Sequence, residues 1–154
     1  MRTLAIDLGT RRVGLALSDQ GGRFATPLDV LEVSSPLQAI SMILPLIERE
    51  AVERIVVGLP LNMDDATLGP AARETIVWAR ELSKGANKPI VFVDERLSTF
   101  AAEQDLIARK RGGERITRKQ KKQQLDALSA ASILQAFLDG KLDPIEIPSA
   151  PALE

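Results

Sequence analysis

The amino-acid sequence predicts an α/β fold in which three antiparallel strands and then two parallel strands form one mixed sheet, flanked by helices in a three-layer α/β/α arrangement. The first 33 residues hold three short apolar runs, and the turns between them are too short for a helix. From Pro36 onward, segments with helical spacing alternate with short apolar runs, a pattern that favours parallel pairing. Together these observations predict a meander followed by helix and strand units.

The meander strands are predicted at Thr3–Leu8, Val13–Asp19 and Phe24–Val33, because each run is rich in residues that favour strands. A helix is predicted from Pro36, since the apolar residues after it recur at helical spacing. Pro45 should bend or break this helix, because proline cannot donate the backbone hydrogen bond of a helix interior.

The second half of the chain alternates strands and helices. A strand is predicted at Arg54–Val57, a helix at about Pro70–Ser83, a strand at Ile90–Val93 and a helix opening at Ser98. A last long helix should span Arg118–Leu138. This alternation accounts for the two parallel strands and the helices on both faces of the sheet.

A single domain is expected over residues 1–139, because the length suits one compact core and no internal repeat is evident. Residues 140–154 contain three prolines and should form an irregular tail. The N-terminus runs directly into a strand pattern and no apolar stretch reaches membrane-spanning length, so a cytoplasmic location without membrane contact is expected.

The amino-acid composition restricts the kinds of reaction and binding site that this chain can have. Cysteine and histidine are both absent, which excludes disulfides, Cys/His zinc sites, thiol nucleophiles and imidazole bases. Tyrosine is absent too, which argues against a single-strand binder built on many stacked rings. The net charge of -1 means that any affinity for nucleic acid must come from local basic clusters.

Three carboxylates are candidates for a reaction centre. Asp7 lies near the end of the first strand, and Glu95 follows the strand Ile90–Val93 at the edge where open α/β sheets place their sites. Asp126 shares a helical stripe with Ala130 and should face the sheet. If the three converge, their repulsion requires a cation, and oxygen ligands select Mg²⁺ or Mn²⁺.

Each carboxylate also has a purely structural interpretation. Asp7 could cap the turn that follows it, by accepting hydrogen bonds from backbone N–H groups. Glu95 could form an exposed ion pair with Arg96 at the strand end. Asp126 could lie at the polar edge of its helix, since helix phase is only loosely fixed by one sequence. Convergence of the three is therefore the assumption on which a metal site depends.

A strongly basic segment precedes the last helix and extends into it, and it is predicted to grip phosphates of a nucleic acid. The alternative is a solvated loop with no ligand. Its basic residues are Arg109, Lys110, Arg111, Arg115, Arg118, Lys119, Lys121 and Lys122. Thr10, Arg12, Asn62 and Arg96 are further candidate contacts, although Thr10 and Arg12 could instead hold their turn and Asn62 could belong to a plain connecting loop.

Five blocks of the sequence, in order and at compatible spacing, resemble one known family, the YqgF-type proteins, which are relatives of the RuvC Holliday-junction resolvases. The blocks are Ile6–Gly14, Ile55–Asp64, Gly69-Pro70, Val93–Thr99, and Asp126 with Ala130-Ala131 and Ile133–Gln135. The resemblance covers most of the chain. Two departures are Asp65, where the family more often has glycine, and Ser129, where alanine is expected.

The resemblance implies a ribonuclease-H-like fold and places Asp7, Glu95 and Asp126 on the family's acidic triad. It implies a metal-dependent nuclease, with two Mg²⁺ or Mn²⁺ ions, that processes the 5′ end of the 16S ribosomal RNA precursor. The expected partners are structured RNA and pre-ribosomal particles, with a DNA junction as the alternative, for a monomer or weak dimer.

Three other functions remain open from the residues alone. A resolvase-like DNA endonuclease would need a dimer with two symmetric sites. A non-catalytic assembly factor would hold ribosomal RNA through the basic segment and keep the carboxylates as structural acids. An ATP-using phosphotransferase also opens on a strand followed by Asp-Leu-Gly-Thr, but such enzymes close two lobes around the nucleotide and this chain has residues for one.

Overall fold

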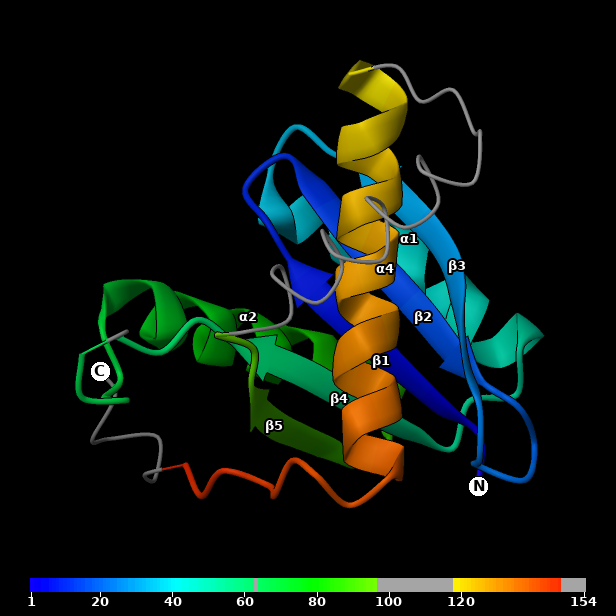
Figure 1. Ribbon diagram of the computed structural model, residues 1–154. Coiled ribbons are helices and arrows are strands. Elements are labelled where there is room, and N and C mark those ends of the chain that lie inside the picture. Colours follow the sequence, from blue (N-terminus) through cyan, green and yellow to red (C-terminus); the bar gives the residue numbers. More distant parts are fainter. Residues whose placement is uncertain (63, 97–117, 148–154) are drawn as a thin grey trace.

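The computed structural model describes residues 1–62, 64–96 and 118–147, and of residues 118–124 it describes the backbone. Five strands form one sheet in the order β3-β2-β1-β4-β5 (Figure 1). The strands are β1 (Thr3–Leu8), β2 (Arg12–Ser18), β3 (Ala25–Glu32), β4 (Arg54–Leu59) and β5 (Ile90–Asp94). Pairing is antiparallel from β1 to β3 and parallel from β1 through β4 to β5, which confirms the predicted mixed sheet.

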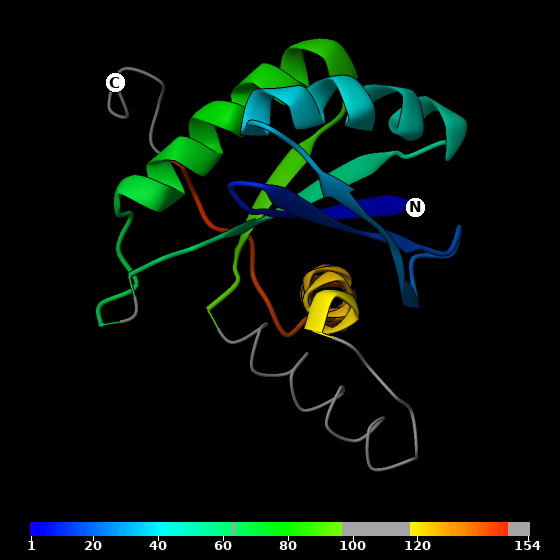
Figure 2. The ribbon, with the colours of Figure 1, turned by 90° about the horizontal axis from the view of Figure 1, so that it is seen from above.

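The described helices are α1 (Pro36–Arg49), α2 (Pro70–Ala86) and α4 (Arg118–Leu138). Helices α1 and α2 cover one face of the sheet and α4 crosses the other, so the predicted three layers are confirmed (Figure 2). The helix predicted to open at Ser98 lies outside the described residues. Within the described part of the chain, no helix is long and apolar enough to cross a membrane.

Helix α1 continues through Pro45 to Arg49, so of the predicted bend or break at this proline, the break does not occur. Ser35 caps its N-terminus by accepting a hydrogen bond from the backbone N–H of Gln38. Buried apolar residues lie on both sides of the proline, among them Ile43 and Ile47. Packing of this stripe against the sheet outweighs the hydrogen bond that Pro45 cannot donate, a loss of about 3 kcal/mol in an isolated helix.

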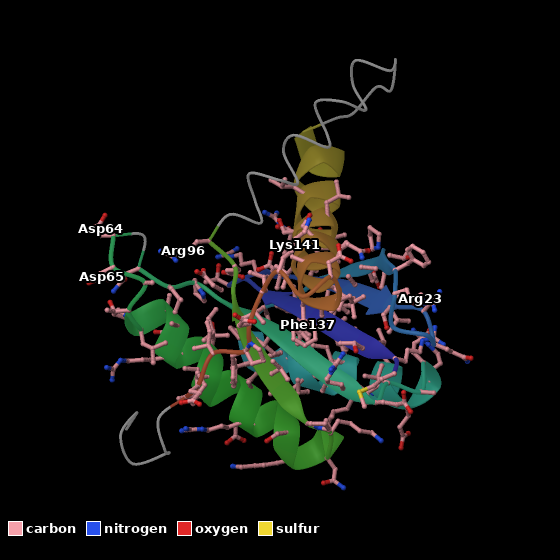
Figure 3. All side chains as sticks on the ribbon, turned by 60° about the horizontal axis from the view of Figure 1, so that its bottom comes forward. Arg23, Asp64, Asp65, Arg96, Phe137 and Lys141 are labelled. Atoms are coloured by element: carbon pink, nitrogen blue, oxygen red, sulfur yellow. The ribbon has the colours of Figure 1, made fainter. Side chains whose placement is uncertain are left out.

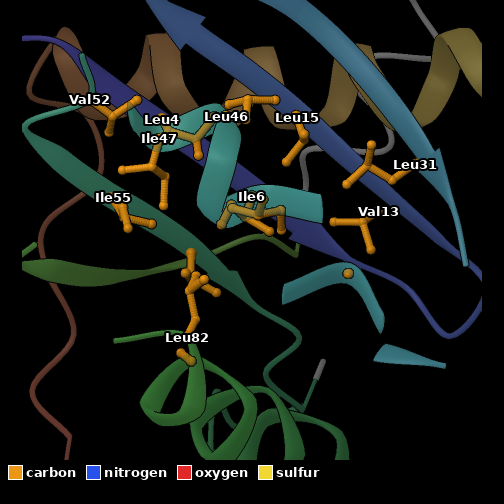
Figure 4. Close-up of a cluster of buried hydrophobic side chains, with 14 of the residues drawn as sticks. Leu4, Ile6, Val13, Leu15, Leu31, Leu46, Ile47, Val52, Ile55 and Leu82 are labelled. Atoms are coloured by element: carbon orange, nitrogen blue, oxygen red, sulfur yellow. The ribbon is translucent and has the colours of Figure 1, made fainter. Parts of the chain in front are cut away.

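The two faces of the sheet bury different side chains, because neighbouring residues of a strand point to opposite sides. Large residues such as Leu4, Ile6 and Leu15 fill the space under α1 and α2 (Figure 4). The face under α4 carries smaller residues, including Ala5 and Ala16. Small side chains let α4 lie close to the sheet, and this closeness positions the residues of α4 that face the strand ends.

After α4 the chain turns back along β5, the edge strand of the parallel half (Figure 1). The backbone N–H of Ile145 donates to the carbonyl oxygen of Phe92 at 2.7 Å, and Leu142 packs against the apolar cluster under α4. The guanidinium of Arg54 lies 4.8 Å from the centre of the Phe137 ring. The contacts of Leu142 and Ile145 hold the segment 139–147 against the sheet.

Candidate active site

Asp7 and Glu95 meet at the carboxyl ends of the parallel strands. β4 is paired between β1 and β5, so the residues that end β1 and follow β5 lie at one edge of the sheet. The backbone N–H of Glu95 donates to the carbonyl oxygen of Leu59 at 3.2 Å and extends the pairing of β4 and β5 past Asp94. This places the Glu95 side chain in a hydrogen bond with the Asp7 carboxyl group.

The carboxyl groups of Asp7 and Glu95 are both poorly solvated, and this burial raises their pKa values. Burial raises the pKa of Asp7, although the hydrogen bond from Glu95 acts in the opposite direction, and the charge of Asp126 raises it further. Burial, the charge of Asp7 and the hydrogen bond with Asp7 raise the pKa of Glu95 to about 9. Without another cation nearby, Glu95 therefore carries a proton at neutral pH and donates it to Asp7.

Two glycines in neighbouring strands make room for these acids. A Cβ atom at Gly58 would lie 2.7 Å from Oε2 of Glu95 and 2.9 Å from Cδ1 of Ile133. A Cβ atom at Gly14 would overlap the backbone carbonyl of Asp126, so glycine lets α4 approach β2 at this point. Sequence reasoning did not assign these positions to the site, although glycine inside an apolar strand is the signal of a close approach.

Asp126 reaches the same edge from α4, but its carboxylate is held by Arg12. Nε of Arg12 donates to Oδ2 of Asp126 at 2.8 Å, and the two side chains are 38% and 31% exposed. The charge of Asp126 acts on Asp7, so the three acids lie in one neighbourhood. Among the residues that the structure describes, however, no three acidic side chains are grouped closely enough to hold one metal ion together.

The turn between β1 and β2 closes on its own backbone, since the N–H of Gly9 donates to the carbonyl oxygen of Arg12 at 3.0 Å. Thr10 is exposed in this turn. A cavity of about 290 Å³ opens here, and its lining residues are Gly9, Thr10, Arg11, Arg12 and Asp126. Two of the predicted nucleic-acid contacts, Thr10 and Arg12, thus lie beside a candidate carboxylate and face a space that a phosphate group can enter.

Asn62, another predicted contact, closes the loop between β4 and α2. Its side-chain amide donates to the hydroxyl of Thr67 at 2.8 Å, and its backbone N–H donates to the Thr67 carbonyl at 3.0 Å. Asp65, one of the two departures from the family pattern, accepts from the Thr67 hydroxyl at 2.7 Å. Ala66 between them adopts a positive φ of 58°. The loop is therefore built as a compact turn in which Asn62 has a structural task.

Arg96 is paired with the residue that ends β5. Its Nη2 lies 2.7 Å from Oδ2 of Asp94, and its Nε donates to the same carboxylate at 2.8 Å. The nearby charge of Asp65 adds to this pairing, and both acids raise the pKa of Arg96. Figure 3 shows Arg96 on the side of the molecule where the loop with Asp64 and Asp65 lies. The ion pair that the structure gives for Arg96 is with Asp94, whereas the sequence-based alternative places it with Glu95.

The structure describes only part of the basic segment between residues 109 and 122. Arg109, Lys110, Arg111 and Arg115 lie outside the described residues. Arg118, Lys119, Lys121 and Lys122 belong to the first turns of α4, of which the backbone is described. The predicted phosphate contacts of this segment stay predictions. Ser129, the second departure from the family pattern, is 2% exposed and lies on the buried face of α4.

The strand order, the acids at the parallel strand ends and the acid on the last helix together define the ribonuclease-H-like class of α/β proteins. Residues 1–140 match the family model described as "RuvX: Holliday junction resolvase". The chain belongs to this family, and the resemblance noted from the sequence is confirmed.

Curated relatives support the assignment over most of the chain. A protein of Rhizobium rhizogenes named "Putative pre-16S rRNA nuclease" is 38% identical over 149 residues, which are 97% of this chain and 87% of the relative. A protein of Geobacillus kaustophilus with the same name is 39% identical over 143 residues, or 92% of this chain and 99% of the relative. The family to which the chain belongs is thus a family of nucleases.

Solved structures confirm the fold. RuvC of Thermus thermophilus in complex with a Holliday junction substrate aligns with a TM-score of 0.56 and 18% identity, covering 94% of this chain and 99% of that one. A second structure of Thermus thermophilus RuvC gives the same TM-score at 17% identity, covering 94% of this chain and 100% of that one. At this level of identity the likeness concerns the fold, which is the ribonuclease-H-like fold expected from the sequence.

Proposed function

We propose that this protein is a metal-dependent nuclease that hydrolyses phosphodiester bonds at the 5′ end of the 16S ribosomal RNA precursor. The observation that carries the proposal is the hydrogen-bonded pair of Asp7 and Glu95 at the strand ends, with Asp126 beside it. Membership of a nuclease family and the names of the relatives support the reaction class and the substrate. Asp7, Glu95 and Asp126 are the proposed catalytic residues.

The donor groups fit a hard divalent cation. Carboxylate oxygens are the ligands that Mg²⁺ and Mn²⁺ prefer, and Cys or His ligands for softer metals do not occur in the chain. Gly58 makes room for the Glu95 carboxyl group, because a Cβ atom at this position would lie 2.7 Å from Oε2 of Glu95. Asp7, Glu95 and Asp126 would hold Mg²⁺ or Mn²⁺, and two ions are the expected number. Such an ion supplies a Lewis acid that lowers the pKa of a water molecule and offsets charge developing on the phosphate.

The side chains of this protein then have separate tasks. Asp7 accepts the hydrogen bond of Glu95 and fixes the orientation of that side chain. Glu95 must release its proton before it can act as a ligand, and a nearby positive charge promotes this release. Thr10 and Arg12 line the cavity in which a phosphate of the substrate would lie. The basic residues between 109 and 122 would follow the RNA backbone, so binding depends on shape and charge more than on base sequence.

The decisive experiment compares wild type with Asp7→Asn on end-labelled 16S precursor RNA, single-stranded DNA and four-way DNA junctions, each with Mg²⁺, Mn²⁺ or EDTA. Metal-dependent cutting of the precursor RNA that is lost in Asp7→Asn is the expected result. Asp29→Asn is the matched control, since Asp29 is exposed on the edge strand β3 and should cut as wild type does.

The other outcomes separate the alternatives. Cutting of four-way junctions but not of RNA would replace the RNA proposal with a DNA endonuclease, and a dimer in solution would then be expected. RNA bound equally by wild type and Asp7→Asn, with no substrate cut under any metal, would replace it with an assembly factor.

A further inference from the structure

Arg12 and Asp126 form the one ion pair that joins the β1–β2 turn to α4 within the described part of the chain. The residues are 114 positions apart in sequence, and the contact joins Nε of Arg12 to Oδ2 of Asp126 at 2.8 Å. Both side chains are roughly one-third exposed. Neither side chain is fully buried, so Arg12 and Asp126 can separate while β2 and α4 stay folded.

The pair lies where a cation is needed. Asp7, Glu95 and Asp126 bring up to three negative charges to one edge of the sheet. In the structure Arg12 offsets part of this charge, because its guanidinium holds Asp126. The guanidinium of Arg12 thus binds the carboxylate of Asp126, which the proposed function assigns to a divalent ion.

We propose that Arg12 and a divalent ion exclude each other at Asp126, and that Arg12, once released, turns to a phosphate of the substrate in the cavity beside it. This inference rests on the proposed function, because it takes Asp126 as a metal ligand. It makes Arg12 a positioning residue with two alternative partners. The protein would then keep its carboxylates paired when no metal is present and gain a phosphate-binding group when one is.

The surroundings of Arg12 allow this exchange. The cavity of about 290 Å³ is lined by Arg12 and Asp126 together with the turn residues Gly9, Thr10 and Arg11, so a short rotation of the side chain suffices. Guanidinium binds carboxylate and phosphate with the same planar set of donors, and phosphate can accept two parallel hydrogen bonds. Arg12 therefore loses no hydrogen bonding when it changes partner.

A supporting role predicts the opposite behaviour. Arg12 could hold Asp126 through Oδ2 and so present Oδ1 to the metal, as outer residues often orient metal ligands. Removal of Arg12 would then weaken metal binding, whereas removal of a competitor strengthens it. The sign of the change in metal affinity separates the two roles, and it can be measured without any turnover of substrate.

The test is binding of Mn²⁺, followed through the electron paramagnetic resonance signal of the free ion, in wild type, Arg12→Gln, Arg11→Gln and Asp126→Asn. Arg12→Gln should bind Mn²⁺ about three- to tenfold more tightly, since the partly exposed, charged hydrogen bond from Arg12 to Asp126 no longer competes with the ion. Arg11→Gln removes the same charge from the same turn and controls for general electrostatics, and it should change the affinity about twofold or less. Asp126→Asn should weaken binding.

The outcomes distinguish this inference from the proposed function. If wild type binds Mn²⁺ and Arg12→Gln binds it equally or more weakly, the exchange is overturned and the metal-dependent nuclease stands. If Arg11→Gln tightens binding as much as Arg12→Gln, the specific competition is overturned as well. If none of the proteins binds Mn²⁺, the metal dependence and the exchange fall together.

A second measurement follows Arg12 in the wild-type chain, and variants serve only for assignment and comparison. The Nε–Hε resonance of Arg12, assigned by its loss in Arg12→Gln, should show a hydrogen-bonded proton without Mg²⁺ and move to the position of a solvated guanidinium when Mg²⁺ saturates the protein. The same solvated position is expected for Asp126→Asn without Mg²⁺. An Arg12 resonance that does not move at saturating Mg²⁺ would refute the exchange.

Discussion

Replacing Glu95 with glutamine should stabilise the metal-free protein at neutral and alkaline pH. The folded chain keeps a proton on Glu95 until about pH 9, whereas the unfolded chain loses it near the ordinary value of 4.5. Between these values unfolding releases a proton, so the stability contributed below pH 4.5 is lost as the pH rises toward 9. Glutamine is neutral at every pH and can still donate a hydrogen bond to Asp7, so the variant escapes this loss.

The size of the change in the free energy of unfolding follows from the raised pKa of Glu95. One proton released on unfolding lowers the free energy of unfolding by at most about 1.4 kcal/mol per pH unit. Because Asp7 shares the proton and the two groups titrate together, we expect a total loss of about 1–3 kcal/mol for wild type between pH 5 and pH 8. Glu95→Gln should therefore match wild type near pH 4.5 and exceed it by about 1–3 kcal/mol at pH 8.

The assay is urea unfolding in EDTA, followed by the fluorescence of Trp78, the single tryptophan of the chain. Its side chain is 4% exposed and its indole N–H donates to the Pro36 carbonyl between α1 and α2, so unfolding changes its environment strongly. Glu74→Gln, an exposed position on α2, is the matched control and should follow wild type at every pH.

Two results would refute the reasoning about Glu95. One is a variant less stable than wild type at pH 8 in EDTA; the other is a stability difference that is the same at pH 4.5 and pH 8. Repeating the titration with Mg²⁺ adds a second comparison. Wild type should gain stability from Mg²⁺ at pH 8, and Glu95→Gln should gain less, because one proposed ligand is gone.

Three further substitutions test how the site is positioned. Gly14→Ala should lower the free energy of unfolding by about 1–3 kcal/mol, because the new Cβ meets the backbone of α4; a stability equal to wild type in urea would contradict this. Gly58→Ala should weaken Mn²⁺ binding by displacing the Glu95 carboxyl group, and unchanged affinity would argue against that placement. Asn62→Ala should destabilise the loop before α2 by about 1 kcal/mol and increase its proteolysis, while cleavage of RNA by the intact protein persists. Gly21→Ala, in an exposed turn, is the control for the two glycine variants.

The elements of the fold could be predicted because their signals are local. The spacing of apolar residues predicts β1 and α4 with the bounds that the structure has. The order of short and long segments along the chain predicts the mixed sheet. Pro45 does not break α1, because the local cost of the proline is outweighed by packing of residues on both sides of it, which the pattern of one segment does not reveal.

The contacts within the site could be predicted only in part. Asp7 and Glu95 were expected at one edge because parallel strands end together, and the structure brings them into contact. The pairing of Asp126 with Arg12 joins residues that no local pattern connects. The bond from Asn62 to Thr67 depends on the path of a loop, which spacing does not fix. Partner choice among charged side chains is decided by tertiary geometry, and one sequence carries little information about it.

The proposed catalytic residues are spread along the chain, and Asp126 joins the others only through the docking of α4. Asp7 and Arg12 emerge from the ribosome early, whereas Asp126 arrives on α4 after most of the sheet has been made. Until α4 docks, the face of the sheet around Ala5 and Ala16 stays uncovered, so this helix both completes the core and supplies the last carboxylate. A chain in which α4 has not yet docked therefore lacks Asp126 at the edge of the sheet where Asp7 and Glu95 meet.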